Sequence, residues 1–327
     1  MKIGIGLYGN NGHQIARLLE DHKDAELMAV AGIDPEELPE SLRNDRKIKF
    51  YSALEEMLTD DRVELVSLCS PKRINQAADA IRCLEAGRHV YAEKPCAMTE
   101  EDLDAIMEAS VRTGFKFHEM AGTAFEQPYI SMRKYIQDGA IGEVVQVFAQ
   151  KSYPYHDKRP QNNDIDGGLI MQVGIHAMRF IEHVAGQKAT YIQAIETKLG
   201  NPVKSGNLHM AASYIIQLEN GGVATIIANY LNPEGFGSWG NEHLRIFGTK
   251  GFIEAVDGGI RTRMIVGDKD YGPFQKLEAA RDYFDYMMDE LQGRAKMPVS
   301  LEDELHPTRM VIKANTCKIS VANEAGK

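Results

Sequence analysis

The first 120 residues of the chain alternate short apolar runs with segments that have the hydrophobic pattern of helices. The apolar runs are almost continuous, which is typical of strands that are buried on both faces of a sheet. Strands of this kind, separated by helices, form a parallel, doubly wound sheet. The predicted strands are Lys2–Leu7, Leu27–Ile33, Val63–Cys69, His89–Ala92 and Phe115–His118.

Polar residues and glycines mark where the intervening helices begin and end. We expect a first helix around Ile15–Leu19, and Ser52 with Glu55 has the form of a capping box for another. Ser70-Pro71 has the form of an N-cap followed by a first helical residue. The remaining predicted helix boundaries are Thr99 as an N-cap, with Gly87 and Gly114 as C-terminal glycines.

Length and composition limit the class of protein. The chain has 327 residues, enough for two domains, and its 43% hydrophobic and 26% charged residues are ordinary for a soluble globular protein. The net charge of −10 argues against nucleic acid or an anionic membrane as a partner, because phosphate groups bind to basic faces. No apolar run approaches the ~18 residues of a transmembrane helix, and the N-terminus has no signal-peptide pattern. The four cysteines form no close pair, so we expect free thiols and a cytoplasmic protein.

The turn after the first strand contains two overlapping glycine patterns. Residues 4–9 match G-x-G-x-x-G, but this match begins inside the strand and leaves no helix directly behind it. Residues 7–12, LYGNNG, fit a dinucleotide-binding turn better, with a leucine in place of the first glycine. Its two glycines would allow a pyrophosphate to approach the backbone and the next helix to pack on the strand, with the helix N-terminus facing the phosphates. The residues of this turn that we expect to bind the cofactor are Gly9, Asn10, Asn11 and Gly12.

Asp34 lies about 20 residues beyond the turn, at the end of the next strand, where an acidic side chain bonds a ribose 2′-hydroxyl. Its carboxylate would repel a 2′-phosphate, so NAD is favoured over NADP as the cofactor. A tight glycine turn in an α/β domain without a dinucleotide is the alternative. The strand, the predicted helix and Asp34 together favour the cofactor.

Glu93-Lys94-Pro95 directly follows the strand His89–Ala92. Ligands of doubly wound sheets bind beyond the carboxyl ends of the strands, so this lysine is placed to pass a proton. Taken alone, the three residues would also fit a surface turn with a solvated ion pair.

Along most of its length the chain resembles the glucose–fructose oxidoreductase, inositol dehydrogenase and rhizopine-catabolism family (Gfo/Idh/MocA). The likeness lies in residues 63–71 (VELVSLCSP), 83–90 (CLEAGRHV) leading into Glu93-Lys94-Pro95, 139–144 (GAIGEV) and 301–305 (LEDEL). The resemblance implies NAD(P)-linked hydride transfer on a sugar, polyol or related carbinol. It also implies that Ser70, Pro71, Asn75, Glu93 and Lys94 contact the cofactor.

The resemblance further implies two domains: a dinucleotide-binding Rossmann domain over residues 1–121, and an α/β domain over residues 122–327 that binds substrate and forms oligomers. The second domain would contain a large, open, mostly antiparallel sheet, and homologous sheets suggest a homodimer or homotetramer. Runs rich in β-branched and aromatic residues agree, and Gly221-Gly222 predicts a hairpin turn. The predicted strands are Val144–Tyr153, Thr190–Thr197, Met210–Leu218, Val223–Asn229 and Leu244–Phe247.

Residues 169–186 form a predicted helix that is mostly apolar but carries one thin polar line: Gln172, His176, Arg179 and His183. His176 is the natural base for a carbinol proton, because an imidazole titrates near working pH. In the resembled family this region has D-x-x-x-H, so Gln172 stands in place of an aspartate. Gln172 can orient the imidazole or bond a substrate hydroxyl, but it brings no charge to stabilise an imidazolium. We therefore expect His176, Lys94 and Gln172 to be the catalytic residues.

Substrate contacts are also expected from Tyr153 and His156, which lead out of the first strand of the second domain. We expect no metal site, because two histidines two turns apart lie about 10 Å apart along a helix and the arginine between them is no ligand. Two other interpretations stay open. One is an NAD-dependent glycosidase or lyase with transient oxidation, and the other is a cofactor-binding protein that has lost catalysis.

Overall fold

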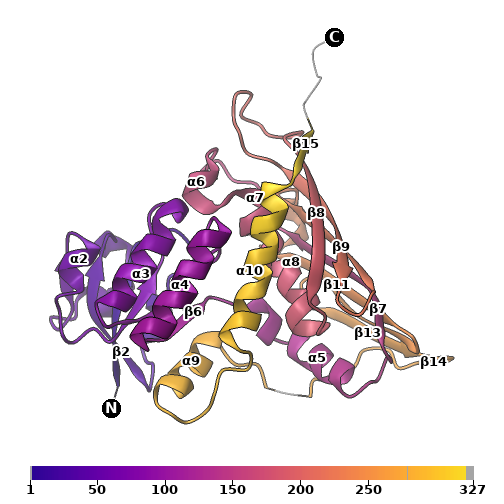
Figure 1. The fold of residues 1–327 in the computed structure, drawn as a ribbon, viewed down its shortest axis with the longest axis horizontal. Helices are drawn as coiled ribbons and strands as arrows, with labels where there is room; N and C mark the ends of the chain where they lie inside the picture. The colour runs from indigo at the N-terminus through magenta and orange to yellow at the C-terminus, as the bar shows by residue number, and fades with distance from the viewer. Residues whose placement is uncertain (1, 278, 322–327) are drawn as a thin grey trace. The chain divides into compact units, whose positions relative to one another are not determined.

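The computed structural model describes residues 2–277 and 279–321 (Figure 1). The chain divides into two compact units. The first contains residues 1–120, 164–166 and 283–305, and the second contains residues 121–163, 167–282 and 306–327. Residues 283–305, late in the chain, therefore belong with the N-terminal fold. Among the described residues, no helix combines the length and apolar character that crossing a membrane needs.

The first unit contains a six-stranded sheet in the order β3-β2-β1-β4-β5-β6, with every neighbouring pair parallel. This order and the parallel pairing are those of a doubly wound dinucleotide-binding fold, so the predicted fold class is confirmed. The apolar runs form these strands because they are buried on both sides: Ile5, Leu7, Val66 and Leu68 have no exposed surface. The strands are β1 Ile3–Tyr8, β2 Ala25–Ala31, β3 Lys49–Tyr51, β4 Leu65–Leu68, β5 His89–Ala92 and β6 Phe117–Glu119.

The helices of the first unit follow the predictions at some ends and depart from them at others. Thr99 caps α4 by accepting a hydrogen bond from the Asp102 amide, and Gly114 ends that helix at a φ of 78°. Ser70, predicted as an N-cap, instead donates to Asp79 inside α3, which begins only at Gln76. The helices are α1 Glu40–Arg43, α2 Leu54–Met57, α3 Gln76–Glu85, α4 Glu100–Thr113 and α9 Tyr283–Leu291; α6 Asn163–Asp166 and α10 Leu301–Thr316 each have residues in both units.

Two other predicted helix starts are wrong. Ser52 bonds the carboxylate of Glu56 rather than pairing with Glu55. After the glycine turn the chain forms only a 3₁₀ turn, Ala16–Leu19. In this segment Glu93 accepts a hydrogen bond from the His13 amide, and the Gln14 side chain accepts one from the Ile15 amide.

The second unit is built on a nine-stranded sheet in the order β14-β13-β12-β11-β7-β10-β9-β8-β15. Most neighbouring pairs are antiparallel, as predicted, but β7 pairs with β10, and β8 with β15, in parallel. In this unit α5, α7 and α8 lie along one face of the sheet (Figure 1). The strands are β7 Val144–Ser152, β8 Ala189–Thr197, β9 Ala211–Leu218, β10 Val223–Asn229, β11 Asn241–Gly248, β12 Gly251–Val256, β13 Arg261–Val266, β14 Lys269–Asp270 and β15 Ile319–Val321; the helix α5 is Tyr129–Gln137.

The predicted helix over residues 169–186 is divided into α7 (Gly168–Gln172), α8 (Gly174–Arg179) and a π-helical turn (Phe180–Val184). The break after Gln172 has a local cause. The Tyr214 hydroxyl donates to the Ile170 carbonyl at 3.0 Å, and this is the carbonyl that the amide of Gly174 would bond in a continuous α-helix. A Cβ at Gly174 would lie 2.3 Å from the same hydroxyl, so only glycine fits there.

Candidate functional site

The glycine turn after β1 is shaped by close contacts that exclude side chains. Gly9 has a φ of 68°, and a Cβ there would lie 2.2 Å from the Cys69 carbonyl oxygen. Gly12 has a φ of 138°, and a Cβ there would lie 2.5 Å from the Glu93 side chain rather than against a helix. Gly4 and Gly6, the start of the other glycine pattern, lie inside β1. The frame at residues 7–12 is therefore the one that forms the turn.

Glu93 is the buried centre of this region. Its carboxylate accepts from the His13 amide and lies 3.0 Å from Nδ1 of the His13 ring. The ammonium of Lys94, itself 2% exposed, lies 3.9 Å from Glu93 Oε1. Burial raises the pKa of Glu93, but His13, Lys94 and Arg73 outweigh it and hold that pKa well below its usual range. Glu93 therefore stays ionised beneath the glycine turn, beside a buried lysine.

Arg73 and Gln76 brace the same turn from the segment after β4. The Arg73 guanidinium, 2% exposed, donates to the Asn11 carbonyl at 2.6 Å and also to the Gln76 side chain. Gln76 in turn donates to the backbone carbonyls of Glu93 and Pro95. These buried bonds fix the turn at Asn11 and the start of the Glu93–Pro95 segment to each other, so a ligand would meet a preformed surface.

A hollow of about 440 Å³ opens beside the glycine turn, between Asn10–Arg17 and the segment Ile33–Pro39. Asp34 lies at the end of β2 and accepts from the Glu36 amide at 3.0 Å. Glu36 and Glu37 line the hollow, and Glu37 also accepts from the Asn10 side chain. The positive φ angles, the excluded side chains and this acidic hollow fit the turn and ribose ends of a dinucleotide. Of the other residues predicted to bind the cofactor, Ser70 is buried, whereas Pro71 and Asn75 are exposed.

In the second unit, the side chain of His176 on α8 forms a hydrogen bond with a tyrosine hydroxyl. The hydroxyl of Tyr153 lies 3.0 Å from Nε2 of His176, and the rings meet edge to face with centroids 6.0 Å apart. Both side chains are buried, His176 at 9% exposed and Tyr153 at 5%. Tyr153, expected only as a substrate contact, therefore orients the predicted base.

Gln172 has a similar partner. The Tyr230 hydroxyl donates to Gln172 Oε1 at 3.2 Å, and the Arg159 guanidinium lies over the Tyr230 ring, 3.7 Å from its centroid. The two tyrosines directly follow β7 and β10, the parallel pair in which Ser152 is opposite Asn229. Carboxyl ends of parallel strands meet at one edge, which brings Tyr153 and Tyr230 to the polar line together.

An aromatic row continues outward from Tyr153. The centroid of its ring lies 5.8 Å from that of Trp239. The centroid of the His156 ring also lies 5.8 Å from that of Trp239, so Trp239 contacts both rings. Lys151 forms a buried ion pair with Glu242 and lies 4.8 Å from the centre of the Tyr153 ring. His156, predicted as a substrate contact, therefore contacts Trp239.

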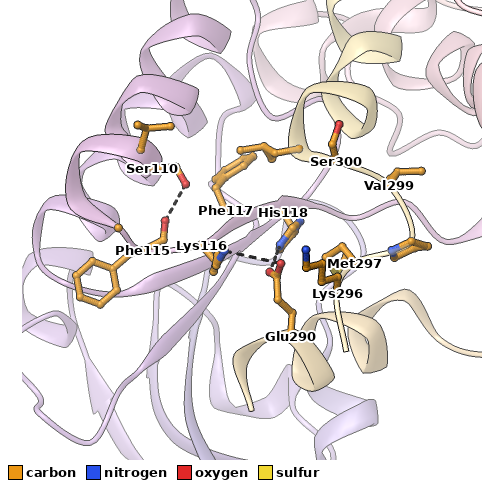
Figure 2. Close-up of a pocket in the computed structure, with 14 residues that line it drawn as sticks. Ser110, Phe115, Lys116, Phe117, His118, Glu290, Lys296, Met297, Val299 and Ser300 are labelled. Atoms are coloured by element: carbon orange, nitrogen blue, oxygen red, sulfur yellow. Dashed lines mark hydrogen bonds and ion pairs between the residues drawn. The ribbon is translucent and has the colours of Figure 1, made fainter. Parts of the chain in front are cut away.

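A second hollow, of about 580 Å³, lies elsewhere in the first unit, between the end of α4, β6 and residues 296–301 (Figure 2). At its wall the buried His118 bonds two carboxylates, Glu304 at 2.8 Å and Glu290 at 3.0 Å. Burial lowers the pKa of His118, but the two carboxylates outweigh it and raise the pKa to about 9. This charged group attaches α9 and the start of α10 to the edge of the parallel sheet.

Two family models match most of the chain. Residues 2–120 match the oxidoreductase family with an NAD-binding Rossmann fold, and residues 129–254 match the GFO/IDH/MocA C-terminal domain. The chain belongs to the Gfo/Idh/MocA family of oxidoreductases. It is accordingly an enzyme of the dehydrogenase type with an NAD-binding fold.

Individual members of the family are distant in sequence. Myo-inositol 2-dehydrogenase of Thermotoga maritima is 22% identical over 304 residues, covering 89% of this chain and 86% of that protein. The 2,7-anhydro-N-acetylneuraminate hydratase of Escherichia coli is 24% identical over 260 residues, covering 77% and 66%.

Solved structures in the family share the fold over nearly the whole chain. A Thermotoga maritima protein described as an oxidoreductase has a TM-score of 0.83 at 27% identity, covering 96% of this chain and 97% of that one. The WlbA dehydrogenase from Bordetella pertussis, in complex with NADH and UDP-GlcNAcA, has a TM-score of 0.78 at 20% identity, covering 97% and 96%.

Several residues that shape this family member's site were missed from the sequence. Arg73 and Gln76 gave no signal, because a buried arginine in a loop has no pattern of its own. Tyr230 and Trp239 were also missed. Tyr230 could have been found by the same argument that selected Tyr153, since each lies where a predicted strand ends.

Proposed function

We propose that the protein is an NAD-dependent dehydrogenase that oxidises a secondary hydroxyl group of a sugar, cyclic polyol or derivative. Residues 1–121 would hold the cofactor, and residues 122–327 the substrate. Bound NAD would supply the acceptor for the hydride that leaves the carbinol carbon. The hydroxyl proton would leave to His176, so that the carbinol loses two electrons and two hydrogens in all.

The observation that carries the proposal is the buried pair His176 and Tyr153. With Nε2–H of His176 donating to the Tyr153 oxygen, the neutral imidazole would carry its one basic lone pair on Nδ1. The Tyr153 bond would hold that nitrogen in a defined direction in a water-poor surrounding, as a general base requires. Lys94, buried beside Glu93 after β5, would bond the same substrate oxygen and relay the proton. Gln172 would bond a neighbouring substrate hydroxyl through its amide group.

The preference for NAD over NADP rests on charge. Asp34 follows β2, where a 2′-phosphate would have to bind, and its carboxylate would repel that phosphate at short range; Glu36 and Glu37 line the adjoining hollow together with Arg17. Gly9, Asn10, Asn11 and Gly12 would border the pyrophosphate, and Ser70, Pro71 and Asn75 the nicotinamide ribose. A higher kcat/KM with NADP than with NAD would contradict this part of the proposal.

A second candidate is a lyase or hydratase that oxidises its substrate only transiently. This candidate is supported by the relative named as a hydratase, because a hydration reaction involves no net oxidation of the substrate. The amount of NADH separates the two: a dehydrogenase forms one NADH per substrate, whereas a transient oxidation regenerates NAD and accumulates none.

The subunit is proposed to form a homodimer or homotetramer through the open face of the large sheet. That face presents exposed apolar side chains from several strands, which solvent-exposed monomer surfaces seldom gather. They are Tyr191, Ile195, Ile215, Val223 and Val145, each 43–63% exposed.

The test of the proposed function is NADH formation with a panel of sugars, inositols and aminosugars. With an active substrate, His176→Ala should reduce kcat by about 100- to 10,000-fold, the usual loss for an acid–base group. His243→Ala, which removes a half-buried imidazole from β11, is the matched control and should keep its turnover. A loss of only a few-fold in the His176 variant would refute its role as the base.

A further inference from the structure

Trp239 is the one tryptophan of the chain, and it is 55% exposed. A single exposed apolar side chain needs no explanation of its own, since such residues are normal on protein surfaces. Trp239 does not stand alone. It is the middle member of the aromatic row that leads from Tyr153, the partner of His176, to His156.

The backbone around Trp239 is fixed. Asn232, which is buried, donates from its side chain to the carbonyls of Ser238 and Trp239 at 2.9 and 3.3 Å. The amide of Asn232 in turn donates to the Tyr153 carbonyl at 3.0 Å. The indole therefore belongs to the same rigid assembly as Tyr153.

Gly240 adds a second anchor. A Cβ at Gly240 would lie 2.6 Å from Glu242 Oε1 and 3.0 Å from Lys151 Nζ, so the backbone after Trp239 is pressed against the buried ion pair. An exposed aromatic ring held in place by buried contacts is preorganised for binding, because little freedom is left to lose.

The position of the indole decides what it can bind. Two successive ring-to-ring steps, 6.0 Å from His176 to Tyr153 and 5.8 Å from Tyr153 to Trp239, separate it from the imidazole. A sugar ring whose hydroxyl reaches His176 would lie near Tyr153. Trp239 is one step further out, where a group attached to that ring would lie.

We propose that Trp239, flanked by His156, is a stacking subsite for the second ring of a glycoside, and that the substrate is larger than a monosaccharide. The apolar C–H face of a sugar ring can lie against the indole, while its hydroxyl groups stay at the rim in water. This inference rests on the proposed function, since it takes His176 as the end of the row at which the reacting ring binds.

The single tryptophan makes the test direct, because indole emission, excited selectively beyond the absorption of the tyrosines, comes from the subsite itself. Maltose, cellobiose and lactose are titrated against D-glucose, D-galactose and myo-inositol, without cofactor and with NAD. At least one disaccharide should shift the emission saturably, and the single-ring compounds should not. In the control Trp239→Phe/Tyr271→Trp, which moves the reporter to an exposed residue beyond β14, the shift should be absent.

Kinetics give the second readout. For the disaccharide that binds, Trp239→Ala should raise KM by about 2- to 13-fold with little change in kcat, the loss expected for one aromatic contact. KM for a single-ring substrate should stay within about two-fold, as for the loss of a contact that this substrate does not make.

Two results would overturn the subsite: no disaccharide moves the emission, or Trp239→Ala raises KM equally for one-ring and two-ring substrates. If monosaccharides are oxidised but no sugar changes the indole emission, the subsite is refuted and the proposed function stands. If a disaccharide shifts the indole emission but no sugar yields NADH, the subsite is supported and the proposed function is refuted.

Discussion

Tyr153→Phe tests whether a tyrosine hydroxyl holds the proposed base. The substitution removes only the oxygen that lies 3.0 Å from His176 Nε2. The ring, with its contacts to His176 and Trp239, is kept. Since both partners are buried, the imidazole loses a bond that water replaces poorly, and such a loss costs about 1–3 kcal/mol. If the imidazole is held this way in the transition state, kcat should fall by about 5- to 150-fold.

The assay is the pH dependence of kcat for NADH formation, measured for the wild type, Tyr153→Phe and Tyr283→Phe. Tyr283 is the matched control, because its buried hydroxyl bonds the Glu304 carboxylate and not His176. Both variants should lose stability, but only Tyr153→Phe should lower kcat and move the pH at which kcat is half maximal. If Tyr153→Phe keeps the wild-type pH profile and kcat, the hydroxyl does not position His176.

The remaining predictions concern pH, assembly and the lysine. In the folded protein the pKa of His118 is raised to about 9, whereas an unfolded histidine titrates near 6.5. The protonated His118 therefore adds about 3 kcal/mol to the free energy of unfolding below pH 6.5, and this stabilisation is lost as the pH rises from 6.5 to 9. NMR titration of the histidines, with His118→Asn to assign the signal, should give a titration midpoint for His118 near pH 9. A midpoint below 7 would show that Glu290 and Glu304 do not hold the charge. Ile215→Lys, at the most exposed of the apolar positions proposed for the interface, should shift the protein to monomers in light scattering at unchanged helix content. An unchanged mass would place the interface elsewhere. Lys94→Ala should reduce kcat about as much as His176→Ala, and activity near that of the wild type would remove the lysine from the mechanism.

The parallel sheet of the first unit was predictable because each strand is a separate apolar run buried on both faces. Even so, β3 was missed: Lys49–Tyr51 is a short edge strand whose residues stay partly exposed, so it has no apolar signal. In the second unit β13 was missed for a related reason: it lies near an edge of the sheet and mixes charged with apolar residues, as in Arg261–Val266. The strand β12 was also missed, although its central residues Ile253, Glu254 and Ala255 are buried. A strand that relies on its neighbours more than on burial leaves little trace in the sequence.

Within the candidate site, the sequence predicted individual polar residues but not the side chains that hydrogen-bond to them. The motif after β5 and the polar line on α7 and α8 led to Lys94 and His176. The bond from Tyr153 to His176 joins residues 23 positions apart, and that from Tyr230 to Gln172 spans 58 positions. Both depend on the parallel pairing of β7 with β10, which no local pattern encodes. His183 lies in the π-helical turn, so it does not continue the α-helical spacing of Gln172, His176 and Arg179 that the sequence predicted.

The glutamine at position 172 can be tested through its chemical differences from an aspartate. The Tyr230 hydroxyl donates to Gln172 Oε1, and a carboxylate oxygen would accept that bond equally well. What aspartate lacks is the amide N–H₂, and it also has a shorter side chain.

Gln172→Asp therefore separates two explanations. If the amide donates to a substrate oxygen, the variant should lose about 1–3 kcal/mol in kcat/KM, and Gln172→Glu, which restores the length without the donor, should not recover it. An increase in kcat/KM would instead mean that a charge beside His176 is what this member of the family is missing. Because Tyr153 already orients the imidazole, the first outcome is expected: with that task met by a strand-end hydroxyl, position 172 is released to recognise the substrate.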